Sequence, residues 1–240
     1  MEPSIAFAAA VVGYCIGAFS FTRLIARIVA PGADLSHTTY VAKGGQQTLE
    51  VTSVNATALA LRAGPKVGLA TGLLDMLKIF VPTLAFRLLY PQEPYFLIVA
   101  VAGMVGHIWP VYYRFKGGRG ISAVYGGLLA IDPLGAVVTA VIGPVLGMLI
   151  RDAYMTFAGG MLLLIPWFWL RTHDMRYVAY AVALNAIFLL ASMAEIREYL
   201  RIRREGREAP AYEEMLQTNP MGKGLFRMGV FLHLIREKPR

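Results

Sequence analysis

Long apolar segments set the first limit on how this chain can fold. An α-helix needs about 20 apolar residues to cross about 30 Å of hydrocarbon, and several runs in this sequence reach or approach that length. Only 16% of the 240 residues are charged and 57% are hydrophobic, whereas about 25% are charged in a typical soluble domain. We therefore predict an all-α integral membrane protein, a bundle of about seven transmembrane helices that includes one short helix. The predicted spans are residues 4–29, 67–89, 93–113, 121–131 (the short helix), 134–150, 154–170 and 177–193.

The basic residues indicate which side of the membrane the ends of the spans face. No lysine or arginine precedes the first span, and Arg23 and Arg27 close it, so we expect the N-terminus outside. Seven crossings then place the C-terminus in the cytoplasm, although the turn from Arg171 to Arg176 goes against the positive-inside rule. If residues 121–131 were re-entrant, six spans would result and the basic tail would lie outside.

The chain divides into a membrane-embedded part and a tail. We expect residues 1–205 to form the membrane-embedded domain and residues 206–240 to form a basic cytoplasmic tail, with an amphipathic surface helix at 224–236. A disordered tail and a partner-docking helix are the alternatives. The net charge of +8 suits anionic lipid at the tail and anionic substrates, and we predict no nucleic-acid binding. The single cysteine, Cys15, excludes an intrachain disulfide and a cysteine metal site.

The stretch Lys116-Gly117-Gly118-Arg119-Gly120 follows the third predicted span and has the composition of a phosphate-binding loop. Its glycines leave backbone N–H groups accessible to an anion, and its two cations add charge and a forked donor. The short helix that starts here would aim its positive end at the same anion. The alternative is a basic turn that only anchors a helix.

Ionisable residues also lie inside the predicted spans. Asp75 and Lys78 are three residues apart and therefore share one helical face. Such groups are costly in a membrane and often mark function, but this pair can also simply neutralise itself, and we keep both interpretations. His107 near the end of the third span is either a structural hydrogen-bonding residue or a base.

The first long loop, residues 33–66, contains further polar candidates. Ser53 and Asn55 precede a predicted helix at 55–62, which Gly64 and Pro65 end. Arg62 would then lie near a helix end at the membrane surface. The alternative is a solvated connector without a function of its own.

Three stretches resemble the bacterial acyl-phosphate:glycerol-3-phosphate acyltransferase family of integral membrane enzymes. Residues 106–122, GHIWPVYYRFKGGRGIS, are similar to its Gly-His-x-Phe-Pro-x-x-x-x-Phe-Lys-Gly-Gly-Lys-Gly motif, with Arg119 in place of the second lysine. Residues 64–82 look like its Gly-Lys-Lys-Ala-Gly and Leu-Leu-Asp-x-Leu-Lys-Gly segment, with the Asp and the Lys in register. Residues 14–27 are similar to its first helix, with Ala-Phe-Ser where the family has Ser-Ile-Pro.

The resemblance implies a reaction at the inner membrane of a bacterial cell. The 1-hydroxyl of glycerol 3-phosphate attacks the carbonyl of an acyl phosphate, phosphate leaves, and lysophosphatidic acid enters phospholipid biosynthesis. Positioning and charge neutralisation can carry most of this reaction because phosphate is a good leaving group, so we predict neither cofactor nor metal. The candidate catalytic residues are Ser53, Asn55 and His107, and the candidate phosphate-binding residues are Arg62, Lys116, Gly117, Gly118, Arg119, Gly120 and Ser122.

The chain departs from the family at two motifs. Between Ser53 and Arg62 it lacks the glycines and the second asparagine of the first cytoplasmic motif, and Ile196 and Tyr199 stand where a C-terminal motif has His and Asn. Two alternatives to the enzyme follow. One is a non-catalytic relative that binds lipid precursors or a partner enzyme, and the other is a small transporter that uses the intramembrane polar residues as a path.

Overall fold

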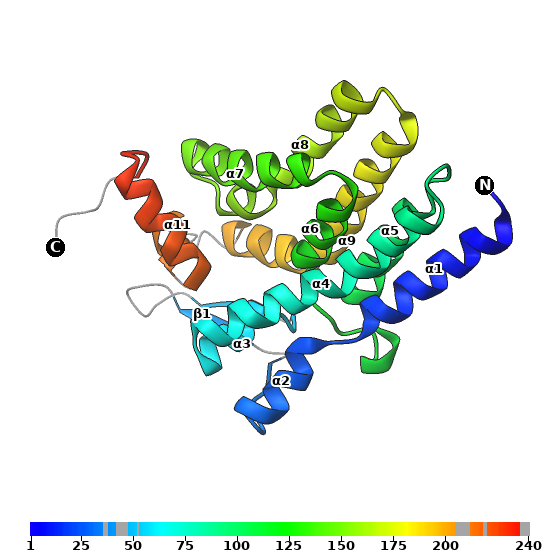
Figure 1. Ribbon diagram of the computed structural model, residues 1–240. Helices are drawn as coiled ribbons and strands as arrows, with labels where there is room; N and C mark the ends of the chain where they lie inside the picture. The colour runs from blue at the N-terminus through cyan, green and yellow to red at the C-terminus, as the bar shows by residue number, and fades with distance from the viewer. Residues whose placement is uncertain (36–37, 42–47, 52, 205–211, 218–219, 236–240) are drawn as a thin grey trace.

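The computed structural model is a helical bundle with a short β-hairpin and a helical tail (Figure 1). The structure describes residues 1–35, 38–41, 48–51, 53–204, 212–217 and 220–235. Its elements are α1 (Pro3–Ala18), α2 (Phe21–Val29), β1 (Thr38–Val41), β2 (Thr48–Val51), α3 (Ala56–Ala63), α4 (Pro65–Leu89), α5 (Tyr95–Ile108), a 3₁₀ turn (Val111–Tyr113), α6 (Ile121–Ile131), α7 (Pro133–Ile150), α8 (Ala153–Thr172), α9 (Met175–Arg204), α10 (Tyr212–Gln217) and α11 (Pro220–Phe231).

The predicted class, a helical integral membrane protein, is confirmed. In the described part of the chain, five helical segments are long and apolar enough to cross a membrane: Pro3–Val29, Pro65–Leu89, Tyr95–Tyr113, Pro133–Ile150 and Met175–Ala194. The short span predicted at 121–131 is a helix with those bounds, α6, and the span predicted at 154–170 lies within α8. The total of seven crossings stays a prediction.

The first predicted span is not one continuous helix over residues 4–29. α1 ends at Ala18, and Ser20 caps α2 because its side chain accepts a 3.3 Å hydrogen bond from the amide of Arg23. The carbonyl of Phe19 is thereby free to accept a 2.6 Å hydrogen bond from Lys78 Nζ. The break in the helix therefore supplies a partner for a lysine that is buried inside the bundle.

The first long loop contains a β-hairpin, which the all-α prediction did not include. β1 and β2 pair antiparallel, with Thr39 opposite Glu50 and Tyr40 opposite Leu49. Their segments, TTYV and TLEV, are rich in β-branched and aromatic residues, which favour strands. The helix predicted at 55–62 is confirmed as α3, one residue later at each end.

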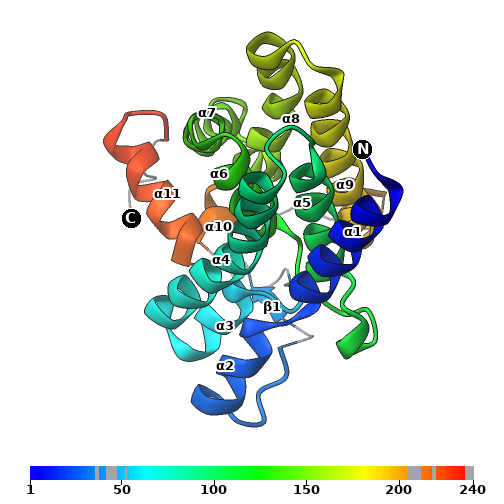
Figure 2. The ribbon, with the colours of Figure 1, turned by 45° about the vertical axis from the view of Figure 1, so that its right-hand side comes forward.

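α1 lies against α5 along a seam of glycines (Figure 2). A Cβ atom at Gly13 would lie 2.5 Å from the carbonyl oxygen of Val99, and one at Gly17 would lie 2.1 Å from that of Gly103. Only small residues allow two helices to approach so closely in a membrane. The seam therefore fixes α1 against the helix that leads into the glycine-rich loop.

The main core joins α5, α6, α8 and α9. Met104, Leu128, Phe168 and Leu184, one from each of these helices, are fully buried in a single apolar cluster. α4 packs across α5 and α6. This core holds both ends of the short helix α6 in fixed positions.

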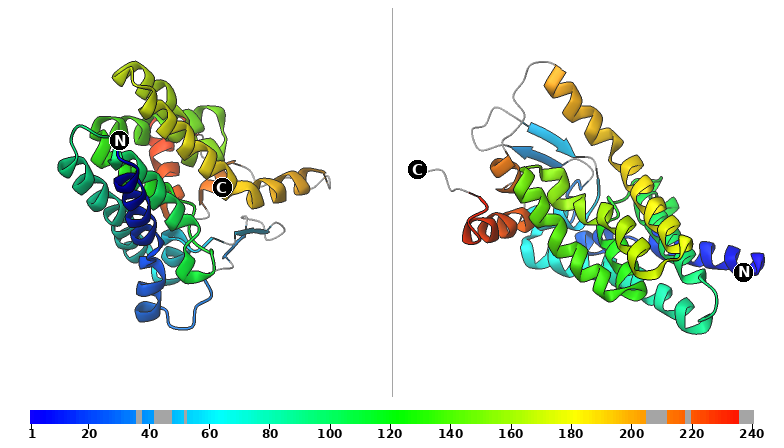
Figure 3. Two further views of the ribbon diagram at one scale, coloured as in Figure 1. Left: turned by 90° about the vertical axis from the view of Figure 1, so that its right-hand side faces the viewer. Right: turned by 90° about the horizontal axis from the view of Figure 1, so that it is seen from above.

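The tail packs onto the bundle near the turn between α7 and α8 (Figure 3). Tyr212, Leu216 and Ile235 form a buried cluster with Met148 of α7, and the hydroxyl groups of Tyr212 and Thr156 are 3.0 Å apart. The surface helix predicted at 224–236 overlaps α11, which starts earlier, at Pro220, and ends earlier, at Phe231. The domain boundary predicted at residues 205–206 lies outside the described residues.

Candidate functional site

The glycine-rich loop folds back on the helix that precedes it. After α5 ends at Ile108, the chain makes the 3₁₀ turn, and Arg114 and Phe115 adopt positive φ angles of 52° and 59°. The amide of Phe115 donates to the carbonyl of Pro110 at 3.0 Å, and the amide of Gly118 donates to that of His107 at 3.1 Å. The loop is therefore held against the last turn of α5.

All three glycines of the loop are required by its shape. A Cβ atom at Gly117 would overlap the carbonyl oxygen of His107. A Cβ atom at Gly118 would lie 2.4 Å from His107 Nε2, closer than nonbonded atoms can approach. Gly120 has a φ angle of +89° as the residue that precedes α6, a conformation that costs other L-residues about 1–2 kcal/mol. Because the amide of Gly118 is already bonded to His107, our prediction that this N–H group binds phosphate is wrong. Gly118 instead shapes the loop.

The turn before α3 lies directly beside this loop, although the two are more than 60 residues apart in the sequence. The amide of Val54 donates a 3.0 Å hydrogen bond to the carbonyl of Gly117. On either side of Val54, Asn55 Nδ2 donates to Ser53 Oγ at 2.8 Å, and Asn55 Oδ1 accepts from the amide of Ala58 at 2.9 Å. Asn55 is thus the N-cap of α3, and Ser53 keeps its own hydroxyl proton to donate.

A buried polar cluster lies beneath the loop. Lys78 Nζ is 2.9 Å from Asp75 Oδ1, and Thr22 Oγ1 donates to Asp75 Oδ2 at 3.4 Å. His107 Nδ1 is 4.0 Å from Asp75 Oδ1. All four side chains are buried. The structure therefore favours structural pairing for Asp75 and Lys78 over contact with substrate.

This burial also changes the role of His107. Its ring lies between Asp75 and the backbone of Gly118, and the residue is only 9% exposed. A base must reach the proton that it removes, and His107 is covered by the loop. The structure therefore favours the structural role of His107, as a residue that positions the loop, over the role of a base.

Arg23 lies beside the loop, although the sequence marks it only as the end of a span. Its Nη2 donates a 2.8 Å hydrogen bond to the carbonyl of Lys116, and its guanidinium lies 4.8 Å from the centre of the Tyr113 ring. Thr22, the adjacent residue, reaches the buried cluster. Ser20, the N-cap of α2, orients both residues. In the sequence, the serine three positions before Arg23 is the signal that a new helix starts there.

The remaining candidates occupy different positions around the loop. Lys116 is exposed, Arg119 is half-buried, and Ser122 lies in the first turn of α6. Arg62 is exposed in the last turn of α3, about 10 Å along the helix axis from Asn55 at 1.5 Å per residue. The structure therefore joins the start of α3, with Ser53 and Asn55, to the glycine-rich loop, and places Arg62 at the far end of α3.

This arrangement suits an anion that approaches the outer side of the loop. Lys116 and Arg119 supply charge, and the amides at the start of α6 point along the positive end of that helix. Ser53 adds a hydroxyl donor from the neighbouring turn. Together these groups can orient a phosphate and a second polar group of the same molecule.

The chain matches a protein-family model described as glycerol-3-phosphate acyltransferase over residues 7–202. A glycerol-3-phosphate acyltransferase of Hyphomonas neptunium is 34% identical over 184 residues, which cover 75% of this chain and 82% of that protein. Proteins of the same name from Anaeromyxobacter sp. and Neisseria meningitidis serogroup C are 34% and 36% identical. Those two alignments cover 54% and 56% of this chain, and 60% and 63% of the relatives.

The fold is similar to that of a solved membrane protein. The structure of PlsY (YgiH), an integral membrane glycerol 3-phosphate acyltransferase, in its lysophosphatidic acid form, matches with a TM-score of 0.69 and 22% identity over 88% of this chain and 98% of that chain. Its glycerol 3-phosphate form matches with a TM-score of 0.68 over 85% of this chain and 94% of that chain. Since the family model covers most of the sequence, this multi-pass membrane protein belongs to the glycerol-3-phosphate acyltransferase family.

Proposed function

We propose that this protein transfers an acyl group from an acyl phosphate to glycerol 3-phosphate. The products are lysophosphatidic acid and phosphate. The relatives carry the name glycerol-3-phosphate acyltransferase, and the hydrogen bond between Val54 and Gly117 is the observation in this chain that supports the proposal most. That bond brings hydroxyl-orienting groups next to phosphate-binding groups, as the reaction requires.

Lys116, Arg119 and backbone amides of the loop hold phosphate in this proposal. The amides are those of Gly117, Gly120 and Ser122, and Ser122 can add its hydroxyl group. Arg62 attracts the second anionic group from the exposed end of α3. Because both substrates carry phosphate, several cations near one membrane surface suit the pair.

The chemical step is a direct transfer. The oxygen of the 1-hydroxyl group attacks the acyl carbonyl carbon, the bond from that carbon to the phosphate oxygen breaks, and the departing phosphate takes up the hydroxyl proton. Ser53 and Asn55 orient the hydroxyl group, and the loop cations stabilise the charge that moves onto the leaving phosphate. No covalent enzyme intermediate is needed.

Purified protein in detergent tests the proposal with palmitoyl phosphate and radiolabelled glycerol 3-phosphate. We expect labelled lysophosphatidate and phosphate to form in equal amounts. Binding of glycerol 3-phosphate without product would contradict the proposal and indicate a non-catalytic relative. Ile196 and Tyr199, which stand where the family has His and Asn, favour that alternative. Uptake of glycerol 3-phosphate into proteoliposomes without product would replace it by a transporter.

We also propose that the tail lies on anionic lipid at the cytoplasmic face of a bacterial inner membrane, with the N-terminus outside. Phe231 is 80% exposed, and Met228 and Leu232 are exposed near Arg227. Apolar side chains beside a cation are typical of a helix on an anionic membrane surface. In a fusion protein that carries the tail, charge reversal at Arg227 should lower the fraction of protein recovered with phosphatidylglycerol vesicles. An equal fraction for the native and the variant tail would exclude the contact.

A further inference from the structure

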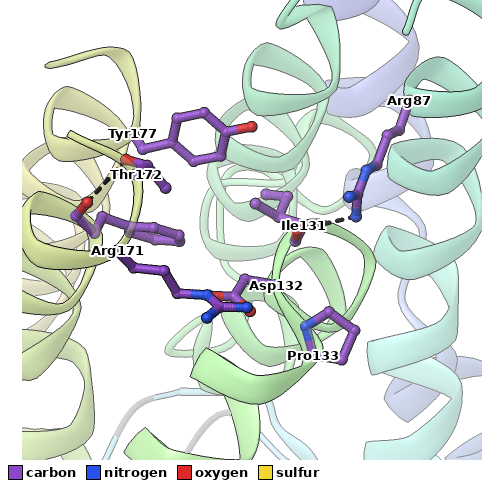
Figure 4. Close-up of a pocket in the computed structure, with 8 residues that line it drawn as sticks. Arg87, Ile131, Asp132, Pro133, Arg171, Thr172 and Tyr177 are labelled. Carbon is purple, nitrogen blue, oxygen red and sulfur yellow. Dashed lines mark hydrogen bonds and ion pairs between the residues drawn. The ribbon is translucent and has the colours of Figure 1, made fainter. Parts of the chain in front are cut away.

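A cavity of about 480 Å³ opens where α6 turns into α7, and we call it the corner cavity (Figure 4). It lies among the ends of α4, α6, α8 and α9 that point away from the glycine-rich loop. Arg87, Asp132, Arg171 and Tyr177 are among the residues that line it. None of them belongs to the proposed acyl-transfer site.

Arg87 enters the cavity from α4 and binds the end of α6. Its Nη1 donates to the carbonyl of Ile131 at 2.9 Å and also to that of Ala130. These carbonyls have no helical partner because α6 ends there. Within the described residues, Nε and Nη2 of this guanidinium form no hydrogen bond, so part of its donor capacity remains.

Arg171 enters from α8, on the opposite side of the corner (Figure 4). Its Nε is 3.0 Å from Asp132 Oδ2, and the same oxygen accepts a 2.7 Å hydrogen bond from Trp167 Nε1. The guanidinium lies 5.7 Å from the centre of the Trp167 ring. Asp132 is thus held in place by two donors, and both Nη groups of Arg171 are left without a hydrogen bond to any described residue.

The charges that line the cavity sum to +1. Arg87 and Arg171 contribute +2 and Asp132 contributes −1. The nearby Arg176 does not add to this sum, because its Nη2 forms a 2.7 Å ion pair with Asp174 Oδ2. Hydrogen bonding to Arg176 lowers the pKa of Asp174, which keeps this carboxylate negatively charged. A ligand with one negative charge and several acceptor oxygens, such as a phosphodiester, would balance the cavity.

The surface around the cavity is apolar. Leu88 and Leu89 follow Arg87 and are 71% and 70% exposed, and Leu170 precedes Arg171 and is 71% exposed. Leu134, beside the corner, is 49% exposed. A bundle that spans a membrane turns such side chains toward lipid chains. A ligand in the cavity would therefore contact hydrogen-bond donors inside the cavity and leucine side chains on the surface around it.

We propose that the corner cavity binds the phosphodiester of a membrane phospholipid in the leaflet opposite to the glycine-rich loop. Arg87 and Arg171 grip the phosphate from two sides, Tyr177 donates its hydroxyl group, and the acyl chains lie along the exposed leucines. This site also accounts for Arg171 and Arg176, which lie in a turn where the positive-inside rule predicts few cations. Arg176 pairs with Asp174, and Arg171 pairs with Asp132 and binds the lipid phosphate.

Native mass spectrometry of delipidated protein tests this site. The probes are dioleoyl phosphatidylglycerol and dioleoylglycerol, which has the same chains and no phosphate. We expect one phosphatidylglycerol to bind more tightly than the rest, and the double variant Arg87→Gln, Arg171→Gln to weaken that event about tenfold or more. Arg176→Gln, which removes an arginine outside the cavity, should bind as the native protein does.

Three results would overturn the proposal. They are equal binding by the double variant, equal binding of dioleoylglycerol, and displacement of the lipid by millimolar inorganic phosphate, which would identify a soluble anion instead. Should Arg171→Gln fail to fold because Asp132 loses a partner, Arg171→Gln with Asp132→Asn removes both charges. We expect this variant to lose the tight event as well, and its retention would also contradict the site.

Discussion

The amide of Val54 donates a 3.0 Å hydrogen bond to the carbonyl of Gly117, and this contact connects the start of α3 to the glycine-rich loop. Each partner has its own anchor in the bundle. The loop rests on His107 and on the cluster beneath it, and Asn55 fixes the turn as the N-cap of α3. A change in either anchor should therefore alter the geometry of both segments.

The contact between Gly118 and His107 can be tested with a reciprocal pair of variants. Gly118→Ala places a methyl group 2.4 Å from His107 Nε2 and should displace the loop. A displacement of about 1 Å can cost about 100-fold in rate, so acyl transfer should fall steeply. His107→Ala removes the obstructing ring, and the double variant should regain part of the loss in kcat. If Gly118→Ala has native activity, the loop does not depend on this approach.

Variants of Asn55 and Ser53 should distinguish an effect on stability from an effect on turnover. Asn55→Ala removes the N-cap of α3 and should destabilise the protein by about 1 kcal/mol, measured as a lower Tm in detergent, with activity reduced as well. Ser53→Ala removes the half-buried hydroxyl group, which also accepts a hydrogen bond from Asn55 Nδ2, and should lower kcat with a smaller change in Tm than Asn55→Ala. Thr57→Ala, on the same helix, is the control. A Ser53→Ala variant with native kcat would remove Ser53 from the proposed site.

The buried ion pair predicts an asymmetry between single and double substitutions. Asp75→Asn leaves Lys78 charged and without its negatively charged partner, which should cost about 3–5 kcal/mol of stability, whereas Asp75→Leu with Lys78→Met should restore most of it. Asp174→Asn, which breaks the exposed pair with Arg176, should cost about 1 kcal/mol or less. Thermal unfolding in detergent measures all three. Equal losses at Asp75 and Asp174 would show that the cluster is not a structural support.

Much of the fold could be predicted from the sequence because its signals are local. The bounds of α6 coincide with residues 121–131, since a glycine-rich loop begins the apolar run and Asp132-Pro133 ends it. The shared face of Asp75 and Lys78 followed from helical spacing, and the two side chains are 2.9 Å apart. The order of residues in Lys-Gly-Gly-Arg-Gly predicts a loop before a helix, and this loop precedes α6. Its phosphate-binding role stays a prediction.

The features that sequence reasoning missed depend on contacts between distant segments. The break after Ala18 is stabilised by Lys78 from another helix, so nothing within the apolar run marks it strongly. Arg23 reaches Lys116 across 93 positions, and no local pattern reports such a pair. His107 is buried because the loop folds over it. The local sequence around a histidine at a helix end does not show whether a distant segment covers it.

The rate of lysophosphatidate formation in Lys116→Ala and Arg119→Ala, compared with Arg176→Ala, tests the central claim most directly. Arg176 is an exposed cation of the α8–α9 turn and controls for the loss of one positive charge. Removing a preorganised charged donor from a reacting phosphate typically costs about 100-fold or more. We predict such losses in the two loop variants and native turnover in Arg176→Ala. Native turnover in both loop variants, with all proteins equally folded, would contradict the account.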